Sequence, residues 1–557
     1  MKESISLGID FGTNSARALL LNIFSGEEIA TAVCGYPGGE EGILLSNQEP
    51  HLARQHPGDY VTALKETVST VVQKARAKGI NPETIVGIGV DTTGSTPLPV
   101  DENMIALGVI KKFKDNLNAQ AWLWKDHTAS EEACEITDLA QKIRPEYLAK
   151  CGGAYSSEWF FSKIFHCLRV DPEVFRAAYS WLELSDYIPA VLAGIQNPDQ
   201  VKRNICAAGH KAIYNKAWNG LPDVDFLTEL DPVLGRLRKR LYNKAYPADT
   251  VAGYLSEAWS KSLGLPQGIP IAVGALDAHL GAVGSGIDNG ILVKIMGTST
   301  CDIMIYPGEN ELADIPGVSG IADDSVIPGY YGIEAGQSAV GDIFNWFVSR
   351  VLDDKDAHER LSEEASKLKA GQNGLLALDW NNGNRNVLTD PNLSGLLVGQ
   401  TLHTTSAEIY RALIEATAFG ARRIIEQLEN YHVDIHKVIN CGGIAEKNPL
   451  VMDIYANVLN RPMEIAGSPE TVALGAAIMG AAAGFKNNGQ QHSIKEIQRR
   501  VCQVKDAVFQ PRAAEVRTYE EMYQLYIDLH DAFGREGNQR SLYHIMKKLL
   551  SIKKAVN

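Results

Sequence analysis

The sequence predicts an α/β protein of two related domains that face each other across a central cleft. Three observations predict this fold class. The chain of 557 residues is too long for a single core. The order strand, strand, strand, helix, strand occurs in residues 4–91 and again in residues 291–443. Each copy has a glycine–threonine turn between its first two strands, "FGTNS" and "MGTST".

In the first copy, alternating apolar residues predict a strand at 4–11 and a second strand at 17–23. A third strand, "EIATAVCGY", follows the turn "SGEE". Apolar side chains at helical spacing predict a helix within 58–79, which Gly79 ends. The nearly continuous apolar run "TIVGIGVD" is typical of a strand that is covered on both faces.

The second copy begins with a strand, a turn and a strand over 291–306, and "GYYGIEAG" predicts its third strand. A long helix is expected at 404–431, because Thr405 and Glu408 have the spacing of a capping box. "KVINCGG" predicts a buried strand that ends in glycines. Two more helices follow, and we expect Ser468 to cap the second of them.

Frequent glycines in 268–286 predict the boundary between the two domains. We therefore divide the chain into an N-terminal domain, 1–283, and a C-terminal domain, 284–557. Beyond about residue 510 the sequence predicts a helix and then a basic tail, which we expect to be partly disordered.

Composition excludes several classes of partner. The net charge is −14 and no stretch is rich in lysine and arginine, which argues against nucleic acid or an anionic membrane as the main partner. The N-terminus lacks the pattern of a signal peptide, and the longest nearly apolar run, "VALGAAIMGAAAGF", is too short to span a bilayer. The eight cysteines lack C-x-x-C spacing, so we expect buried thiols in a cytoplasmic protein rather than a disulfide framework or a zinc site.

The two glycine–threonine turns predict a phosphate site. Small residues in a hairpin let backbone N–H groups converge on a phosphate, and threonine and serine hydroxyls add donors. Asp10 lies directly before the first turn. Its carboxylate could hold a hydrated Mg²⁺, or it could only form an Asx-turn with Gly12 or Thr13.

Two further features each allow two interpretations. Gly442 and Gly443 would let the backbone approach a flat ligand such as adenine before a helix that begins near Lys447, or they form an ordinary turn. Asp277 follows an apolar strand and precedes a helix of small residues. It could cap that helix, or it could accept a proton from an alcohol that attacks a phosphate.

Several stretches resemble the FGGY carbohydrate kinases, a family within the actin-like ATPase superfamily. They are "GIDFGTNSARAL", "VGIGVDTTGSTPLPV", "LWKDHTA", "GGAYSSEWFFSKI", "AAGHKAIYN", "VGALDAHLGAVGSG", "VKIMGTSTCDIMI", "GIEAGQSAVGDIFNWF" and "GGIAEKNPLVMDIYANVLNRP". The resemblance covers nearly the whole chain, up to about residue 535. It implies two ribonuclease-H-like domains around the cleft, with the sugar on the N-terminal side and ATP largely on the C-terminal domain.

The resemblance also implies a role for individual residues. Asp277 would be the catalytic base, and Asp10 would bind the metal ion of MgATP. The residues implied to contact the nucleotide are Thr13, Asn14, Ser15, Arg17, Gly297, Thr298, Ser299, Gln337, Gly442, Gly443 and Asn448. The residues implied to bind the sugar are Thr96, Trp124, Lys125, Asp126, Lys211, Asp277 and Glu334. His127, His210 and His279 lie in the same motifs, where structural roles are at least as well supported.

The segments "DTTGSTP", "WKDHTA" and "GTSTCD" resemble those of family members that phosphorylate L-ribulose at O5 in L-arabinose catabolism. They imply L-ribulose and ATP as the substrates. Sister kinases for D-ribulose, ribitol, D-xylulose or glycerol are alternatives, and a non-catalytic actin-like or chaperone-like ATPase is a more distant one. The sequence leaves open whether copies of the chain form a homo-oligomer.

Overall fold

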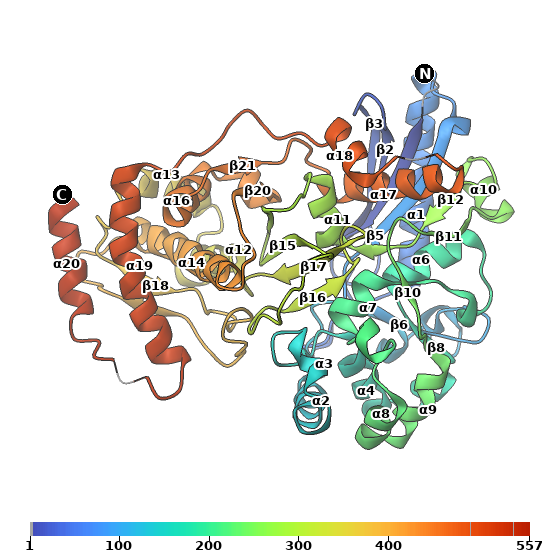
Figure 1. The fold of residues 1–557 in the computed structure, drawn as a ribbon, viewed down its shortest axis with the longest axis horizontal. Helices are drawn as coiled ribbons and strands as arrows, with labels where there is room; N and C mark the ends of the chain where they lie inside the picture. Colours follow the sequence, from blue (N-terminus) through green and yellow to red (C-terminus); the bar gives the residue numbers. More distant parts are fainter. Residues whose placement is uncertain (1–3, 491, 539, 557) are drawn as a thin grey trace.

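The computed structural model describes residues 4–490, 492–538 and 540–556. Its first half is built on one mixed sheet (Figure 1). The strands of this sheet are β1 (Ile5–Phe11), β2 (Ser15–Asn22), β3 (Glu28–Gly35), β5 (Ile85–Thr92), β11 (Val251–Tyr254), β12 (Pro270–Ala272) and β13 (Ala275–Leu276). Their order is β11-β12-β5-β1-β2-β3, with β13 beside β5.

The second half repeats this sheet. Its strands are β14 (Ile291–Met296), β15 (Thr300–Pro307), β16 (Gly320–Asp323), β17 (Tyr330–Ala335), β20 (Lys437–Cys441) and β21 (Met463–Ile465). Their order is β16-β17-β15-β14-β20-β21. β14 pairs antiparallel with β15 and parallel with β20, as β1 does with β2 and β5. The pairing of the predicted strands is therefore repeated in the two sheets, but the chain order is not an exact repeat, because β16 precedes the predicted third strand, β17, and lies at the edge of the second sheet.

Helices and short strands cover the first sheet and fill the long connection between β5 and β11. The helices of this half are α1 (Pro57–Ala77), α2 (Ser130–Ile143), α3 (Glu146–Ala149), α4 (Phe160–Val170), α5 (Pro172–Ala177), α6 (Leu184–Ala193), α7 (Ile205–Lys211), α8 (Val224–Leu230), α9 (Pro232–Leu237), α10 (Glu257–Leu263) and α11 (Asp277–Gly284). The short strands are β4 (Arg54–Gln55), β6 (Pro97–Val100), β7 (Ala121–Trp122), β8 (Ser180–Glu183), β9 (Arg203–Asn204) and β10 (Ala245–Tyr246).

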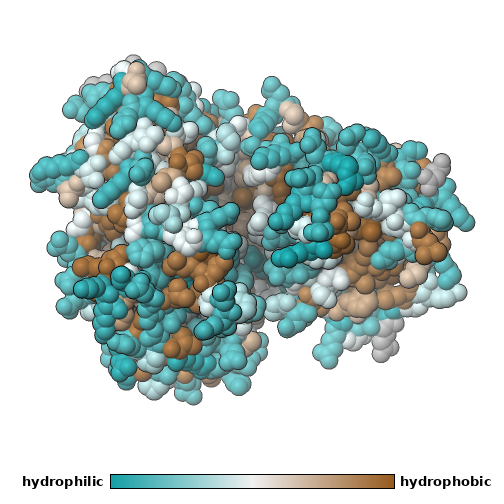
Figure 2. Space-filling model, turned by 180° about the vertical axis from the view of Figure 1, so that it is seen from behind, coloured by the Kyte–Doolittle hydropathy of each residue, from teal (hydrophilic) through white to brown (hydrophobic). Residues whose placement is uncertain are grey.

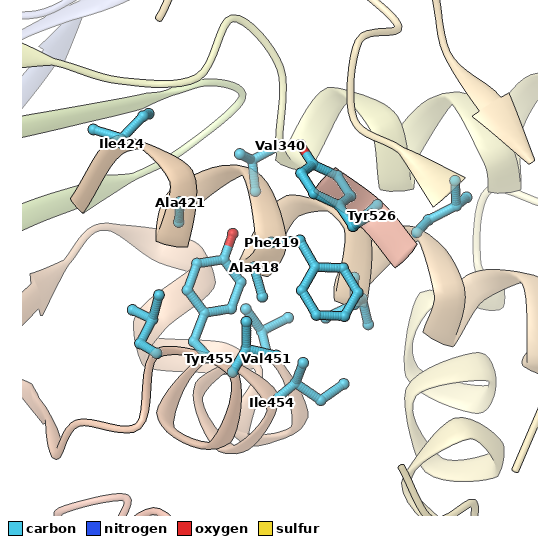
Figure 3. Close-up of a cluster of buried hydrophobic side chains, with 14 of the residues drawn as sticks. Val340, Ala418, Phe419, Ala421, Ile424, Val451, Ile454, Tyr455 and Tyr526 are labelled. Atoms are coloured by element: carbon cyan, nitrogen blue, oxygen red, sulfur yellow. The ribbon is translucent and has the colours of Figure 1, made fainter. Parts of the chain in front are cut away.

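The second half has its own helical cover. Its helices are α12 (Gly341–Trp346), α13 (Ala357–Ser366), α14 (Ser406–Glu429), α15 (Gly443–Lys447), α16 (Pro449–Leu459), α17 (Thr471–Asn487), α18 (Ile494–Val501), α19 (Ala513–Gly534) and α20 (Ile545–Val556). A hairpin of β18 (Leu376–Leu378) and β19 (Leu396–Val398) packs with them. Figure 3 shows Phe419 of α14 packed among Tyr455 and Ile454 of α16 and Tyr526 of α19 in one buried cluster.

Two predictions about helix starts and one about the C-terminal tail can be compared with the structure. Thr405 and Glu408 form the expected capping box at the start of α14. Ser468 does not cap α17, because its Oγ accepts the N–H of Glu470 at 3.0 Å and the helix begins only at Thr471. The basic tail is not disordered over 545–556. It forms the amphipathic helix α20, which buries Ile545, Leu549 and Ile552.

Helices α11 and α17 connect the two halves. Although α17 belongs to the second half of the sequence, it packs on β1 and β5 of the first sheet (Figure 1). It also packs on α11, which contacts β14 and β15. The contact is very close, because a Cβ on Gly475 would lie 1.8 Å from the carbonyl oxygen of Leu280. This packing places Asp277, the first residue of α11, at the junction of the two halves.

The two halves form separate lobes, with a hollow between them on the face seen in Figure 2. All eight cysteines are free thiols, but only four are buried as expected: Cys151, Cys167, Cys206 and Cys441. Cys34, Cys301 and Cys502 are partly exposed and Cys134 is exposed, so the expectation of buried thiols is wrong for these four. No helix among the described residues is both long enough and apolar enough to cross a membrane.

Candidate active site

Asp10 is the last residue but one of β1, a fully buried strand, and is itself only 4% exposed. Arg17 lies opposite it on β2, with Nη1 3.8 Å from Oδ2. Burial raises the pKa of Asp10 to about 6, although Arg17 acts in the opposite direction. The N–H of Gly12 donates to the carbonyl of Ser15 at 3.0 Å, so it does not form an Asx-turn with Asp10.

Asp277 is the first residue of α11, and Leu276 occupies the N-cap position. Its Oδ1 accepts the N–H of Ala278 at 2.7 Å. Its Oδ2 has no hydrogen-bond partner in the part of the chain that the structure describes, so this oxygen can accept a proton from a ligand. Burial, with Asp10 as the next largest cause, raises the pKa of Asp277 to about 7. The geometry therefore favours the general base over the helix cap.

Two side chains from other segments hold the first predicted phosphate turn, Gly12–Ser15, in place. The carbonyl of Thr13 accepts a hydrogen bond from Gln55 Nε2 at 2.6 Å, and its Oγ1 accepts one from Trp124 Nε1 at 3.1 Å. Asn14 is exposed, and its amide donates to the carbonyl of Glu41 at 2.7 Å. Trp124, which the resemblance implies as a sugar ligand, therefore also holds the turn at Gly12–Ser15 through its indole N–H.

The second predicted phosphate turn, Gly297–Ser299, contributes Gly297 and Thr298 to the lining of a cavity of about 1210 Å³. The carbonyl of Thr298 accepts the N–H groups of Val340 at 2.8 Å and Asp342 at 3.1 Å, which fixes the turn to the start of α12. Residues that line the cavity include Gly297, Thr298, Gly341, Tyr410, Gly443, Ile444, Asn448 and Phe509. A cavity of this size beside such a turn is suited to a nucleotide.

The Gly-Gly bend joins the cavity to the second sheet. Gly442 has φ +91°, and a Cβ there would lie 2.6 Å from the carbonyl oxygen of Met296. Only glycine therefore fits where this bend packs on the phosphate turn. Asn448 lines the cavity but also caps α16 through the N–H of Val451 at 3.2 Å, so the helix begins at Pro449, close to its expected start.

Gln337 departs from its expected place at the nucleotide. Its Nε2 donates to Asp379 Oδ2 at 2.7 Å and to the carbonyl of Thr417 at 2.8 Å. The side chain is thus buried in the core of the second half, and it is not among the residues that line the cavity. Its backbone N–H still supports β15 through Thr300 Oγ1, at 3.0 Å.

Lys211 and Glu334, which the resemblance implies as sugar ligands, form an ion pair with each other. Nζ of Lys211 lies 2.7 Å from Oε1 and 2.9 Å from Oε2 of Glu334, and each residue is 5% exposed. Burial raises the pKa of Glu334, but Lys211, His279 and His210 together outweigh it and hold that pKa far below its usual value. The pair therefore offers a polyhydroxy ligand charged donors and acceptors.

Two histidines pack beside this pair, with ring centroids 4.4 Å apart. His210 Nδ1 and His279 Nε2 each lie 3.6 Å from Oε2 of Glu334. Burial lowers the pKa of His279 to about 4 and that of His210 well below its usual value, so both rings are neutral at neutral pH. Neither ring nitrogen of His279 has a hydrogen-bond partner among the described residues.

The side chains of two expected sugar ligands, Asp126 and Thr96, contact other groups of the protein. Asp126 is completely buried, forms an ion pair with Arg54 and accepts the N–H of Ala53 at 2.7 Å. Thr96 is also completely buried, with its hydroxyl 3.1 Å from that of Thr93. The motif predicted proximity to the cleft but not the direction of these side chains, which is inward.

Lys125 is partly exposed, and its positive charge interacts with Asp342, a residue of the other half that lines the cavity described above. Burial raises the pKa of Asp342, and Lys125 partly offsets this effect. Of the predicted sugar ligands, Lys125 therefore lies near this cavity.

Sequence reasoning missed three charged residues of the cleft. Glu158 and Arg385 come from opposite halves and form an ion pair at 3.4 Å. Burial raises the pKa of Glu158, but Arg385, His127 and Lys211 outweigh it and lower that pKa, so this ion pair lies near Lys211. Asp91 ends the apolar strand β5, in the same position relative to its strand as Asp10. That position was the available signal for Asp91, whereas nothing in the sequence pointed to Arg385.

Comparisons with known proteins agree with this geometry. Residues 5–284 match the N-terminal domain of the FGGY family of carbohydrate kinases, and residues 292–484 match its C-terminal domain. A ribulokinase of Halalkalibacterium halodurans is 40% identical, with 99% of this chain and 98% of that one covered. A ribulokinase of Mycolicibacterium smegmatis is 37% identical, with 97% and 96% covered.

Solved structures share the fold. A structure described as a xyloylose kinase from Brucella ovis has a TM-score of 0.78 at 18% identity, over 95% of this chain and 99% of that one. Plasmodium falciparum glycerol kinase with ADP has a TM-score of 0.73 at 16% identity, over 95% and 98%. The family matches cover both halves, and the curated relatives span nearly the full length. The chain therefore belongs to the FGGY family of carbohydrate kinases.

Proposed function

We propose that the protein transfers the γ-phosphoryl group of ATP to O5 of L-ribulose, giving L-ribulose 5-phosphate and ADP. The observation that carries this proposal is the position of Asp277. Besides burial, the charges of Asp10, Glu334 and Lys211 shift the pKa of its carboxyl, so Asp277 lies close to all three. We assign Asp10 to the phosphate side of the site and Glu334 and Lys211 to the sugar side. The ribulokinase relatives, 34–40% identical over nearly the whole chain, support L-ribulose as the acceptor.

The chemistry assigned to this chain is proton transfer and positioning. Oδ2 of Asp277 accepts the proton of the C5 hydroxyl while that oxygen attacks the γ-phosphorus, and the bond to the bridging oxygen of ADP breaks. The turns at Gly12–Ser15 and Gly297–Ser299 hold the phosphates from opposite sides. Arg17 stabilises the charge that spreads over the transferred group. Positioning supplies most of the rate, because phosphoryl transfer needs little covalent assistance.

The site also fits a divalent cation. Asp10 is a buried carboxylate whose ion pair with Arg17 is long, 3.8 Å, and Arg17 is 44% exposed. A carboxylate that is buried and weakly paired favours a hard cation such as Mg²⁺. We assign Asp10 to hold the Mg²⁺ of MgATP. When bound, this ion neutralises phosphate charge as the phosphoryl group is transferred.

We also propose the division of labour between the domains. Residues 1–283 would carry the sugar side and residues 284–557 the nucleotide side, with α17 reaching back to the first sheet. We place the reaction in the cytoplasm, as a step of L-arabinose use. A homo-oligomer is compatible with this assignment, which requires only one chain per site.

The test is ADP release measured with a panel of pentuloses, pentitols and glycerol at fixed ATP, with the phosphate position in the product determined by NMR. We expect L-ribulose to give the highest kcat/KM, with D-ribulose or ribitol slower and glycerol poor. A buried polar group left unpaired costs about 1–3 kcal/mol, so each lost pairing should lower kcat/KM roughly tenfold.

Other outcomes would separate the alternatives. If D-xylulose or glycerol exceeded L-ribulose tenfold, the family would stand and the substrate assignment would fail. If no polyol stimulated ADP release, the protein would be a non-catalytic ATPase of the actin-like or chaperone-like class. In all of these assays the variant Asp277→Asn serves as the control for contaminating kinases.

A further inference from the structure

Asp91 is a buried carboxylate to which the mechanism above gives no role. It is 0% exposed, and neither of its carboxylate oxygens accepts a hydrogen bond from an N–H or O–H group of the described residues. The carboxyl of Asp10 lies close enough to interact with it directly and, after burial, is a further cause that raises the pKa of Asp91. Buried polar groups are almost always paired, because an unpaired charge away from water is costly. Two carboxyls this close cannot both be ionised unless a cation neutralises them, and otherwise they share one proton. The ionised pair therefore needs a positively charged partner that is not part of the chain.

The sheet places Asp91 beside the two acidic residues already described. On one side its register partner is Asp10 of β1. On the other side its register partner is Ala275 of β13, two residues before Asp277. Neighbouring strands are about 4.8 Å apart, so the three carboxylates lie at the same edge of the sheet.

The fold itself does not require carboxylates at these positions. In the second sheet, Ile295 precedes the phosphate turn by the same spacing as Asp10, and its register partner on β20 is Cys441. These two residues occupy the positions that Asp10 and Asp91 occupy in the first sheet. The repeated half thus forms the same strand pair with an apolar residue and a thiol, so the acidic pair serves something other than folding.

Positive charge from the chain is scarce at this edge. Arg17 lies 3.8 Å from Asp10 and 3.9 Å from Glu470, so it is shared between two carboxylates. No ion pair involves Asp91 within the described ranges. A doubly charged cation with oxygen ligands would neutralise both members of the acidic pair.

We propose that Asp91 is a second carboxylate of the divalent-cation site and holds, together with Asp10, the metal ion that accompanies ATP. This inference rests on the proposed kinase function, because the cation arrives with the nucleotide. All-oxygen donors select hard cations, so Mg²⁺ and Mn²⁺ fit this site better than Zn²⁺.

The first experiment measures Mn²⁺ binding to the enzyme–ADP complex by electron paramagnetic resonance, without sugar. For Asp91→Asn we expect Mn²⁺ to bind 10- to 100-fold more weakly, as when a supporting carboxylate is lost from a metal site. ADP affinity in EDTA should stay within about twofold of wild type. The matched control is Thr92→Val, which removes the neighbouring buried hydroxyl and should leave Mn²⁺ affinity unchanged.

A second variant separates a role at the metal from a role in folding. Asp91→Cys places in β5 the residue that β20 already has at this register position, so the sheet should accept it. A thiolate prefers soft metals. The ratio of Cd²⁺ to Mn²⁺ affinity should therefore rise at least about tenfold over wild type, which a merely structural residue would not cause.

The possible failures are distinguishable. If folded Asp91→Asn and Asp91→Cys bind Mn²⁺ within twofold of wild type and the Cd²⁺ preference is unchanged, the role of Asp91 is overturned while the kinase function stands. If the wild-type protein binds no Mn²⁺ with ADP, the kinase function fails, and the role of Asp91 fails with it. L-Ribulose phosphorylation by the wild type is measured separately and does not enter this comparison.

Discussion

Lys211 on α7 and Glu334 on β17 join the two halves of the molecule through a buried ion pair of 2.7 and 2.9 Å. Each side chain comes from a different domain, so the pair exists only when the cleft is assembled. A sugar bound here would meet a cation and a carboxylate that are already fixed in place.

The first prediction concerns this pair. Lys211→Ala and Glu334→Ala should each raise KM for L-ribulose at least about tenfold and change KM for ATP by less than twofold. Removing one member of a buried pair costs about 3–5 kcal/mol of stability, so initial rates should be measured at low temperature on protein checked by circular dichroism. Glu334→Gln, which keeps the shape, is the milder companion. Equal increases in both KM values would contradict a sugar-binding role.

The second prediction concerns Asp277. A positioned general base contributes about 10²–10⁴-fold, so Asp277→Asn should lose that much kcat and keep both substrates bound. Its stability should not fall. Because burial raises the pKa of Asp277 to about 7, the folded chain tolerates the charged form poorly, and the amide should raise Tm at pH 8 relative to wild type. A loss of less than tenfold in kcat, or a lower Tm, would instead favour a helix-terminal role.

The third prediction is a pH profile. Asp277 acts as a base only when it is deprotonated, and its pKa is about 7. Therefore kcat/KM for the sugar should fall about tenfold per pH unit below 7 and level off above it. The residual activity of Asp277→Asn should lack this acidic limb. A wild-type profile that is flat from about pH 5.5 to 8 would remove Asp277 from the rate-determining proton transfer.

The fourth prediction concerns Asp10. Asp10→Asn should lower kcat strongly and raise the Mg²⁺ concentration needed for half-maximal rate, because one buried carboxylate of the cation site is lost. The KM for L-ribulose should change little. The measurement is a Mg²⁺ titration at saturating sugar and ATP. Normal turnover at ordinary Mg²⁺ would leave Asp10 as a residue of the turn.

The fifth prediction separates Asp126 from the sugar site. Asp126→Ala leaves the buried guanidinium of Arg54 without its ion-pair partner. We expect a loss of about 3–5 kcal/mol in the free energy of unfolding, measured with urea, and little change in KM for sugar in the folded fraction. A large rise in sugar KM with unchanged stability would restore the role that the motif implied.

The sequence predicted the repeated framework because hydrophobic periodicity and turn residues are local signals. Strands 4–11 and 291–306 and the capping box at Thr405 depend on neighbours in the chain. The family resemblance placed Lys211 and Glu334 together among the implied sugar ligands, but their ion pair was found only in the structure. The strands and the capping box required no knowledge of which strands pair.

Other features depend on contacts between distant residues. Asp91 resembles an ordinary strand-end residue until the register places it beside Asp10, far away in the sequence. Asp126 and Gln337 lie in cleft motifs, yet their side chains turn into the core, toward Arg54 and Asp379. A motif indicates where the backbone runs, whereas partners in other segments decide which way a side chain points.

The position of α17 has a consequence for synthesis on the ribosome. Strands β1 and β5 emerge early, but the helix that covers them begins only at Thr471. Translation proceeds at roughly 5–20 residues per second, so tens of seconds pass between the synthesis of β5 and that of α17. The face of these strands that α17 later covers carries Ser6, Gly8, Gly87 and Gly89, which expose little apolar surface. The N-terminal domain therefore completes its folding late in translation, and a nascent chain arrested before α17 would remain open to proteolysis.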